Sequence, residues 1–338
     1  MSRLSDFYEY DLSKVIKFVN EFKAKKVLIQ IPDGFKHYVV ELINELSTYL
    51  NDVHFVVDAN PIYGSCILNN YLVKDYDLVL HFGHEPYPYY RGPDNVVFID
   101  FLSKLRPTNE LVSELVSSLN SLGCRKVSVY TVHQHKKSTE VIGRYLMSYG
   151  FEVLNNLSNA TIMGCWFNDA LRYLDLIDCY VVVSSGLFHP LGLGLLTTGR
   201  KHIVQLDLYR GEVRVVDDEV SKYLRIRYSK VMEALDSRVW CLIHGVEGQY
   251  REFVRDSLIK TLRSRGLRYY EYRTHIVNEE VLRNIDTVEF NVYVITSCPR
   301  IPIDDLSHYE KPVLTPGEAL MVLKGLRDYV FPWSHNLI

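Results

Sequence analysis

The sequence lacks the features that mark secreted, membrane or nucleic-acid-binding proteins. It has no apolar run long enough to span a bilayer, and its first residues lack the apolar core of a signal peptide. Basic residues are not in excess, because 38 lysines and arginines stand against 41 acidic residues, a formal net charge of -3. Neither nucleic acid nor a membrane surface is therefore an expected partner. We expect a cytoplasmic protein.

Cysteine is scarce as well: six occur in 338 residues, and none lies in a CxxC pair. In a reducing cytosol they are not expected to form a disulfide framework. Cys124, Cys179 and Cys241 adjoin or lie within strand-like apolar runs, so we expect them in the core. The other three lie in loops beside small residues or proline, which let the backbone approach a ligand closely. These loops are Gly64-Ser65-Cys66, Gly164-Cys165 and Ser297-Cys298-Pro299.

Two further motifs are missing or incomplete. No GxGxxG or P-loop sequence follows an expected strand, which argues against a metal-free nucleotide-binding α/β protein. His133 and His135 could chelate a metal, but two ligands are too few for a site. We expect both histidine side chains to be exposed.

What the sequence does contain is a weak internal repeat. A helix expected over 12–22 leads to a strand at 26–31, a helix over 39–50, a strand at 53–58, the Cys66 loop and a strand at 77–83. The same order then returns, since Val27 and Val127 open equivalent strands and Cys66 and Cys165 lie 99 residues apart (165 − 66). A third unit starts with a helix at about Asp218. It is not an exact copy, because Cys298 follows its last expected strand.

Alternating helices and short apolar strands predict parallel sheets that are covered on both faces. We therefore expect an α/β fold of three related parallel-sheet domains. They would cover residues 1–105 with Cys66, 106–216 with Cys165, and 217–338 with Cys298. Ligands of such sheets gather beyond the carboxyl ends of the strands, where one cysteine from each domain could converge.

Seven segments, in order, resemble the archaeal diphthamide synthase family, the 2-(3-amino-3-carboxypropyl)histidine synthases. They are IPDGFK (31–36), YGSC (63–66), HFGHEPYP (81–88), IMGCWF (162–167), SSGLFHPLGL (184–193), GVEGQYRE (245–252) and SCPRIPIDD (297–305). The last segment, followed by KPVLTPGE (311–318), is the most specific. The sequence departs from the family at Asn60-Pro61-Ile62 and at 67–70, where the family often has acidic residues.

The resemblance implies three α/β domains in a pseudo-threefold arrangement, a homodimer, and a 4Fe–4S cluster held by Cys66, Cys165 and Cys298. The implied reaction transfers the 3-amino-3-carboxypropyl group of S-adenosylmethionine to a histidine of translation elongation factor 2, the first step of diphthamide biosynthesis. It is a radical reaction that releases methylthioadenosine and needs an electron donor, which the sequence does not identify. The CxxxCxxC run of the larger radical S-adenosylmethionine superfamily is absent here.

Three thiolates suit this chemistry, because a cubane has four irons and three protein ligands leave one iron open to substrate. The amino acid end of S-adenosylmethionine must then be gripped by the protein. Arg300 is our first candidate, since a guanidinium can hold a carboxylate with two parallel hydrogen bonds. Gln249 is the second, because it opens an expected helix whose N–H groups could meet an anion. A surface arginine and a simple helix start are the alternatives.

Several other residues follow expected strands on the side where α/β sites form. His84 and His189 could orient substrate or contact the incoming histidine, although a lone histidine is more often a structural hydrogen-bond partner. Gly186 and Gly192 would let their loop approach the adenosyl group closely, and Gly34 is interpreted in the same way. A plain tight turn is the alternative for each glycine.

Two other functions fit three cysteines on an α/β framework. A cluster used as a Lewis acid, as in quinolinate synthase, would bind iron but release no methylthioadenosine. A non-catalytic member that supports a partner would have lost a ligand cysteine or Arg300, and this sequence retains them. The motif set therefore favours the transferase.

Overall fold

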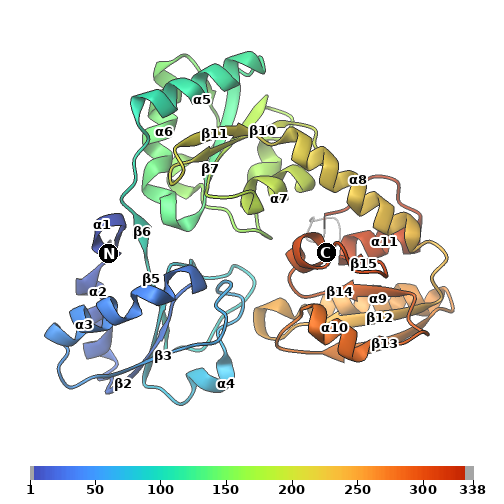
Figure 1. The fold of residues 1–338 in the computed structure, drawn as a ribbon, viewed down its shortest axis with the longest axis horizontal. Coiled ribbons are helices and arrows are strands. Elements are labelled where there is room, and N and C mark those ends of the chain that lie inside the picture. Colours follow the sequence, from blue (N-terminus) through green and yellow to red (C-terminus); the bar gives the residue numbers. More distant parts are fainter. Residues whose placement is uncertain (1–3, 332–338) are drawn as a thin grey trace. The chain divides into compact units, whose positions relative to one another are not determined.

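A computed structural model describes residues 4–331 of the chain. Its contacts define two compact units, unit 1 with residues 1–106 and 132–138, and unit 2 with residues 107–131 and 139–338 (Figure 1). Nothing in the two units tests the three expected domain boundaries, which stay a prediction. Each of the three expected segments contains one main sheet of four or five strands.

Unit 1 contains a parallel sheet of order β3-β2-β4-β5. Its strands are β2 (Lys26–Gln30), β3 (His54–Val57), β4 (Leu78–Phe82) and β5 (Val96–Ile99). Its helices are α1 (Leu4–Phe7), α2 (Leu12–Glu21), α3 (Val39–Tyr49) and α4 (Asn70–Val73), with a 3-10 helix at Asp33–Tyr38. The short strands β1 (Tyr8–Glu9) and β6 (Leu102–Ser103) pair antiparallel. Helix α2 begins where Asp11 accepts a hydrogen bond from the Lys14 N–H, a typical N-cap.

The first sheet of unit 2 has the order β11-β10-β9-β7-β8, with only β11 antiparallel. Its strands are β7 (Lys126–Thr131), β8 (Glu152–Val153), β9 (Cys179–Val183), β10 (His202–Asp207) and β11 (Glu212–Val215). Its helices are α5 (Asn109–Ser121), α6 (Lys136–Ser148) and α7 (Phe188–Leu196), with 3-10 turns at Leu157–Asn159 and Ala170–Tyr173. The 3-10 turn at His133–His135 and the first three residues of α6 belong to unit 1.

The second sheet of unit 2 has the order β13-β12-β14-β15 and is parallel throughout. Its strands are β12 (Val239–His244), β13 (Arg268–Arg273), β14 (Val292–Ile295) and β15 (Val313–Leu314). Its helices are α8 (Asp217–Glu233), α9 (Glu252–Ser264), α10 (Glu279–Ile285) and α11 (Pro316–Lys324), with a π-helical turn at Ile301–Asp305 and a 3-10 turn at Glu247–Gln249. Helix α8 follows β11 and connects the first sheet of unit 2 to the second (Figure 1).

The three sheets share one strand order, in which the first strand is flanked by the second and the third, and the fourth pairs with the third. This common order confirms the α/β class and agrees with the internal repeat. The sequence did not predict the fourth strands, β5, β10 and β15. The connections reverse direction between the first and third strands, and the carboxyl edge at such a point is where ligands of α/β sheets bind.

One expectation about the cysteines is wrong. Cys124 and Cys179 are fully buried as expected, but they form a disulfide with a Cα separation of 6.0 Å. The strand order causes this, because Cys124 lies just before β7 while Cys179 opens the neighbouring β9 and pairs with Val127. Cys241 in β12 is fully buried, as predicted, and burial raises the pKa of its thiol to about 12.

The expectation for His133 and His135 is also wrong, because both side chains are buried. They lie in a 3-10 turn that follows β7. His133 Nδ1 lies 3.3 Å from Glu85 Oε1, and its Nε2 lies 3.5 Å from Asp100 Oδ1. Glu85 and Asp100 are distant from His133 in the sequence, so the residues around this histidine do not predict the contacts.

A buried ion pair in unit 2 connects α8 with α11. Arg227 and Glu318 are both fully buried, and their side chains form two hydrogen bonds of 2.8 and 2.6 Å. Arg227 Nη1 also donates to the Pro302 carbonyl at 2.7 Å. Burial alone would raise the pKa of Glu318, but Arg227 and the other donors outweigh burial and lower it. The pair therefore fixes the segment that follows Cys298.

Candidate active site

Each of the three loop cysteines lies in a turn that follows a strand, and each is half-buried. Cys66 lies in a turn closed by the Ile67 N–H and the Gly64 carbonyl, and Cys165 in one closed by Met163 and Trp166. The Cys298 carbonyl accepts from the Ile301 N–H at 3.2 Å. Cys66 and Cys165 follow the second strands of their sheets, β3 and β8, whereas Cys298 follows the third strand, β14.

Arg300 is buried in unit 2, not exposed, with 2% of its surface accessible. Its Nη2 donates to Asp304 Oδ1 at 2.8 Å, and Nε lies 2.7 Å from Asp304 Oδ2. Among residues 4–331 its Nη1 has no hydrogen-bond partner. Burying an unsatisfied charged donor is costly, so this atom is suited to an anionic group of a ligand. Burial raises the pKa of Asp304, while Arg300 opposes that shift.

His189 and Phe188 begin helix α7 on the side of Arg300. The guanidinium carbon lies 4.4 Å from the centre of the Phe188 ring, within the range of a cation–π contact. Burial, with a contribution from the Arg300 charge, lowers the pKa of His189 to about 3, so its ring is neutral near pH 7. Its Nδ1 is buried and has no partner among the described residues. His189 therefore offers a neutral polar atom beside a fixed positive charge.

Gly192 brings three segments together. It lies within α7, not in a loop, and a Cβ atom there would be 2.7 Å from Phe167 Cζ, 3.2 Å from Arg300 Nη1 and 3.4 Å from the Gly164 carbonyl oxygen. Cβ contacts under 3.0 Å essentially do not occur, so the position requires glycine. The absence of a side chain at Gly192 therefore lets helix α7 pack closely against the turn of Cys165 and the guanidinium of Arg300.

Gln249 lies next to the Cys298 loop. It ends the 3-10 turn Glu247–Gln249, so it precedes helix α9 instead of opening it as expected. A Cβ atom on Gly245 would lie 2.7 Å from Ser297 Cβ and 2.9 Å from Gln249 Cβ. Ser297 Oγ is buried and has no partner among residues 4–331. Unit 2 thus gathers Arg300, His189 and Gly192, and it places Gln249 beside the residue that precedes Cys298.

The remaining two glycines differ from Gly192. Gly186 follows β9 with a φ of 70°, a left-handed conformation that favours glycine, and no atom lies within 4 Å of a Cβ there. Gly34 lies in a 3-10 helix after β2, with open space where its side chain would be. The backbone of Gly186 accounts for its identity as a tight turn, whereas nothing in the described structure requires glycine at position 34.

In unit 1, His84 belongs to a network that sequence reasoning missed. His84 Nδ1 lies 2.9 Å from Nε2 of the fully buried His81, whose Nδ1 lies 2.9 Å from Gln30 Oε1. Gln30 Nε2 in turn donates to Asp58 Oδ2 at 3.0 Å. The available signal was one polar residue at the end of each apolar strand: Gln30, Asp58 and His81.

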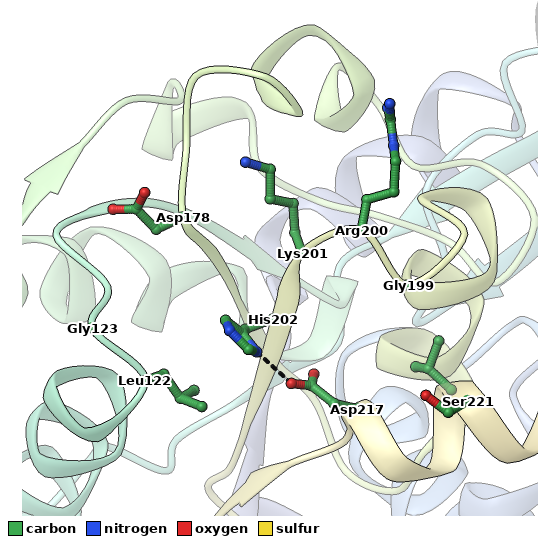
Figure 2. Close-up of a pocket in the computed structure, with 10 residues that line it drawn as sticks. Leu122, Gly123, Asp178, Gly199, Arg200, Lys201, His202, Asp217 and Ser221 are labelled. Atoms are coloured by element: carbon green, nitrogen blue, oxygen red, sulfur yellow. Dashed lines mark hydrogen bonds and ion pairs between the residues drawn. The ribbon is translucent and has the colours of Figure 1, made fainter.

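Unit 2 also has a cavity of about 380 Å³ (Figure 2). It lies at the amino ends of the strands of the first sheet. Gly123, Asp178 and Lys201 line it where the chain enters β7, β9 and β10. On another wall His202 Nδ1 lies 2.5 Å from Asp217 Oδ2. Because these are the amino ends of the strands, the cavity is separate from the Arg300 site at the carboxyl ends.

The family model of diphthamide synthesis proteins matches residues 31–333. The chain belongs to the diphthamide synthesis protein family. The 2-(3-amino-3-carboxypropyl)histidine synthase of Pyrococcus horikoshii is 29% identical over 95% of this chain and 92% of that protein. The synthase of Methanocaldococcus jannaschii is 24% identical over 97% of this chain and 94% of that protein.

The crystal structure of Dph2 from Pyrococcus horikoshii with a 4Fe–4S cluster superposes with a TM-score of 0.82 and 26% identity. The match covers 96% of this chain and 94% of that one. The family assignment and the α/β fold inferred from the sequence are thereby confirmed. No helix among residues 4–331 is long and apolar enough to cross a membrane.

The cysteines of this diphthamide synthesis protein suit an iron–sulfur cluster by their chemistry. Cluster ligands are thiolates, and each loop cysteine is half-buried in a turn beyond a strand. A Cβ atom on Gly64 would lie 3.9 Å from Cys66 Sγ, an ordinary van der Waals contact, so the space beside the sulfur is open. Within the described residues, no group of three His, Cys, Asp or Glu side chains forms a metal site.

Proposed function

We propose that this chain transfers the 3-amino-3-carboxypropyl group of S-adenosylmethionine to a histidine of translation elongation factor 2 in the cytoplasm. Cys66, Cys165 and Cys298 each supply one thiolate to a 4Fe–4S cluster, and the chain works as a homodimer with an external electron donor. The family membership and the Pyrococcus horikoshii structure with its cluster support this proposal. When bound, the cluster supplies the electron that starts a radical cleavage of the sulfonium carbon–sulfur bond.

The observation that carries the proposal is the buried Arg300 guanidinium with its unpartnered Nη1. We propose that this atom binds the carboxylate of S-adenosylmethionine, which replaces the water that Nη1 loses on burial. Asp304 holds the guanidinium in place from the other side, at 2.7 and 2.8 Å. Phe188 covers its face and excludes water.

The other residues of unit 2 complete the grip. The neutral His189 presents Nδ1, and Gln249 presents an amide beside Ser297, so polar groups of the ligand can be satisfied without a second charge. Gly186 and Gly192 leave room for close approach of the ligand, and we keep Gly34 of unit 1 as a further candidate contact. Orientation decides which bond of the sulfonium breaks, so these contacts determine the product.

The first experiment measures iron after anaerobic reconstitution. Cys66→Ala, Cys165→Ala and Cys298→Ala should each lose most of the bound iron, because two thiolates do not hold a cubane as three do. Cys241→Ala is the matched control, since this thiol is fully buried within β12 and should leave the iron content unchanged. A loop variant that kept a full cluster would remove that cysteine from the ligand set.

The second experiment incubates the reduced protein with S-adenosylmethionine and elongation factor 2. We expect methylthioadenosine and a modified histidine, detected by mass spectrometry. Iron binding without methylthioadenosine would favour the Lewis-acid alternative, and methylthioadenosine only in the presence of a second family member would favour a supporting role. Arg300→Lys should raise the KM for S-adenosylmethionine about tenfold, because an ammonium lacks the planar fork that holds Asp304 with two nitrogens and leaves a third for the ligand.

A further inference from the structure

A buried carboxylate at the end of β3 fixes the orientation of an amide. Asp58 has 1% of its surface exposed and accepts hydrogen bonds from Gln30 Nε2 at 3.0 Å and from Asn69 Nδ2 at 2.7 Å. Gln30 Nε2 also donates to the Leu68 carbonyl at 2.7 Å. Both partners of Nε2 can only accept, so the nitrogen of Gln30 must face them and Oε1 must face away.

This amide fixes the tautomer of His81. A carbonyl oxygen cannot donate, so His81 Nδ1, which lies 2.9 Å from Gln30 Oε1, carries the hydrogen. Burial lowers the pKa of His81 well below its usual value, so the ring is neutral. A neutral imidazole holds one hydrogen, which leaves a lone pair on His81 Nε2.

His81 in turn fixes the tautomer of His84. Its Nδ1 lies 2.9 Å from His81 Nε2 and must donate to the lone pair there. Burial, with a contribution from His133, lowers the pKa of His84 to about 4, so this ring is also neutral near pH 7. His84 Nε2 therefore holds a lone pair and no hydrogen. Among residues 4–331 this atom has no hydrogen-bond partner.

The network also holds the loop of Cys66. Leu68 and Asn69 bond to Gln30 and Asp58 on one side of the cysteine, and on the other side Ser65 Oγ donates to the Glu85 carbonyl at 2.5 Å. Glu85 is the residue after His84. The proposed cluster ligand Cys66 and the free lone pair of His84 thus belong to one hydrogen-bonded assembly inside unit 1.

The nearby charged groups do not compete for His84. Glu85 and Asp100 face His133 at 3.3 and 3.5 Å, and Lys136 Nζ lies 2.8 Å from Asp100 Oδ2. Lys136 Nζ also lies 4.0 Å from Glu85 Oε1, so one ammonium group is within ion-pair distance of both carboxylates. His84 Nε2 is left as an acceptor of set direction for a donor that comes from outside the unit.

We propose that His84 Nε2 receives the ring N–H of the substrate histidine. This inference rests on the proposed function and assigns His84 to the protein substrate instead of S-adenosylmethionine. The name 2-(3-amino-3-carboxypropyl)histidine, the product of the related synthases, places the new bond at ring carbon 2. That carbon lies between the two ring nitrogens, so an acceptor that holds one N–H fixes the ring while leaving carbon 2 open. His84 positions the ring and exchanges no atom with it.

The test uses two replacements with opposite geometry. His84→Asn places an amide nitrogen near the position of Nδ1, which preserves the donation to His81 but removes the acceptor. His84→Gln extends an amide to the position of Nε2, where its oxygen can accept. His54→Asn, at the exposed start of β3, is the matched control.

We expect the reconstituted His84→Asn variant to keep its iron content and its cleavage of S-adenosylmethionine without elongation factor 2. Its kcat/KM for elongation factor 2 should fall about tenfold or more, the usual effect of losing one hydrogen bond to a buried partner. His84→Gln should recover part of that loss, and His54→Asn should behave as wild type. Nitrogen-15 spectra of histidine-labelled, iron-free protein near pH 7 should show His84 with hydrogen on Nδ1 only.

Four results would overturn the inference. A higher KM for S-adenosylmethionine, with the KM for elongation factor 2 unchanged, would assign the lone pair to the cofactor. Unchanged kinetics in His84→Asn, or hydrogen on Nε2 in the spectra, would remove the acceptor role. If the wild-type protein itself modified no histidine, the proposed function would fail and this inference with it, whereas failure of the variants alone leaves that function standing.

Discussion

Glu318→Gln is the substitution whose cost the structure defines best. Every group that faces the Glu318 carboxylate is a donor: Arg227 Nε and Nη2, the Thr315 N–H at 2.8 Å and the Tyr329 hydroxyl at 2.8 Å. A glutamine in the same place would turn an NH2 group toward donors, and it would leave the Arg227 charge buried without a counterion. Breaking a buried pair in this way costs about 3–5 kcal/mol.

The assay is the free energy of unfolding of unit 2 from urea titrations at pH 7, with wild type as reference. Glu279→Gln is the matched control, because Glu279 pairs with Arg283 at the surface, where water screens the charges and an ion pair adds little stability. A cost below about 1 kcal/mol for Glu318→Gln would refute the reasoning, since it would mean that the buried carboxylate behaves like an exposed one.

The same pair predicts a pH dependence. The folded pKa of Glu318 is lowered relative to its ordinary value, so its contribution is present above the unfolded pKa of about 4.3 and is lost as the pH falls through the folded value. The difference between wild type and Glu318→Gln should therefore shrink below about pH 4. A difference that stayed constant down to pH 3 would show that the charge is not what stabilises this contact.

Two further substitutions test other contacts in unit 2. Replacing Cys124 and Cys179 together by alanine should lower the free energy of unfolding by about 4 kcal/mol under non-reducing conditions, the chain-entropy value for a 55-residue loop. Full alkylation of both thiols in denatured, unreduced wild type would contradict the disulfide. Gly192→Ala should raise the KM for S-adenosylmethionine about tenfold, because its Cβ would displace Phe167 and Arg300 by several tenths of an ångström. An unchanged KM would show that these side chains can move without affecting the site.

The elements that the sequence predicted are those with a strong local pattern. Helix α2 was expected over 12–22 and covers Leu12–Glu21, because apolar residues recur at the helical period and Asp11 caps the first turn. Strand β15 has two residues, Val313 and Leu314, and exists only because β14 lies beside it. A two-residue segment is too short to show an alternation of apolar and polar residues. Its pairing with β14 therefore depends on the tertiary structure and not on the local sequence.

Contacts between distant residues explain what the sequence could not predict. The disulfide joins Cys124 to a residue 55 positions away, and it depends on β7 and β9 being neighbours. His133 was expected to be exposed, yet it is buried and its ring lies near Glu85 and Asp100. The candidate site shows the same limit: Arg300 was identified from its place after Cys298, but its burial and its partner Asp304 became visible only in the fold.

The imperfect third repeat is where the chemistry of the site becomes specific. In the shared strand order, the second and third strands flank the first and lie two strand spacings apart, about 10 Å. Cys298 follows the third strand, so it lies on the other side of the switch point from where an exact copy of the Cys66 and Cys165 loops would place it. Two residues after Cys298 the chain has Arg300, whereas Leu68 and Phe167 stand two residues after Cys66 and Cys165. The proposed substrate has a sulfonium and a carboxylate, which need unequal surroundings. The departure from the repeat thus places a buried guanidinium, which we propose binds the substrate carboxylate, in the loop of one proposed cluster ligand.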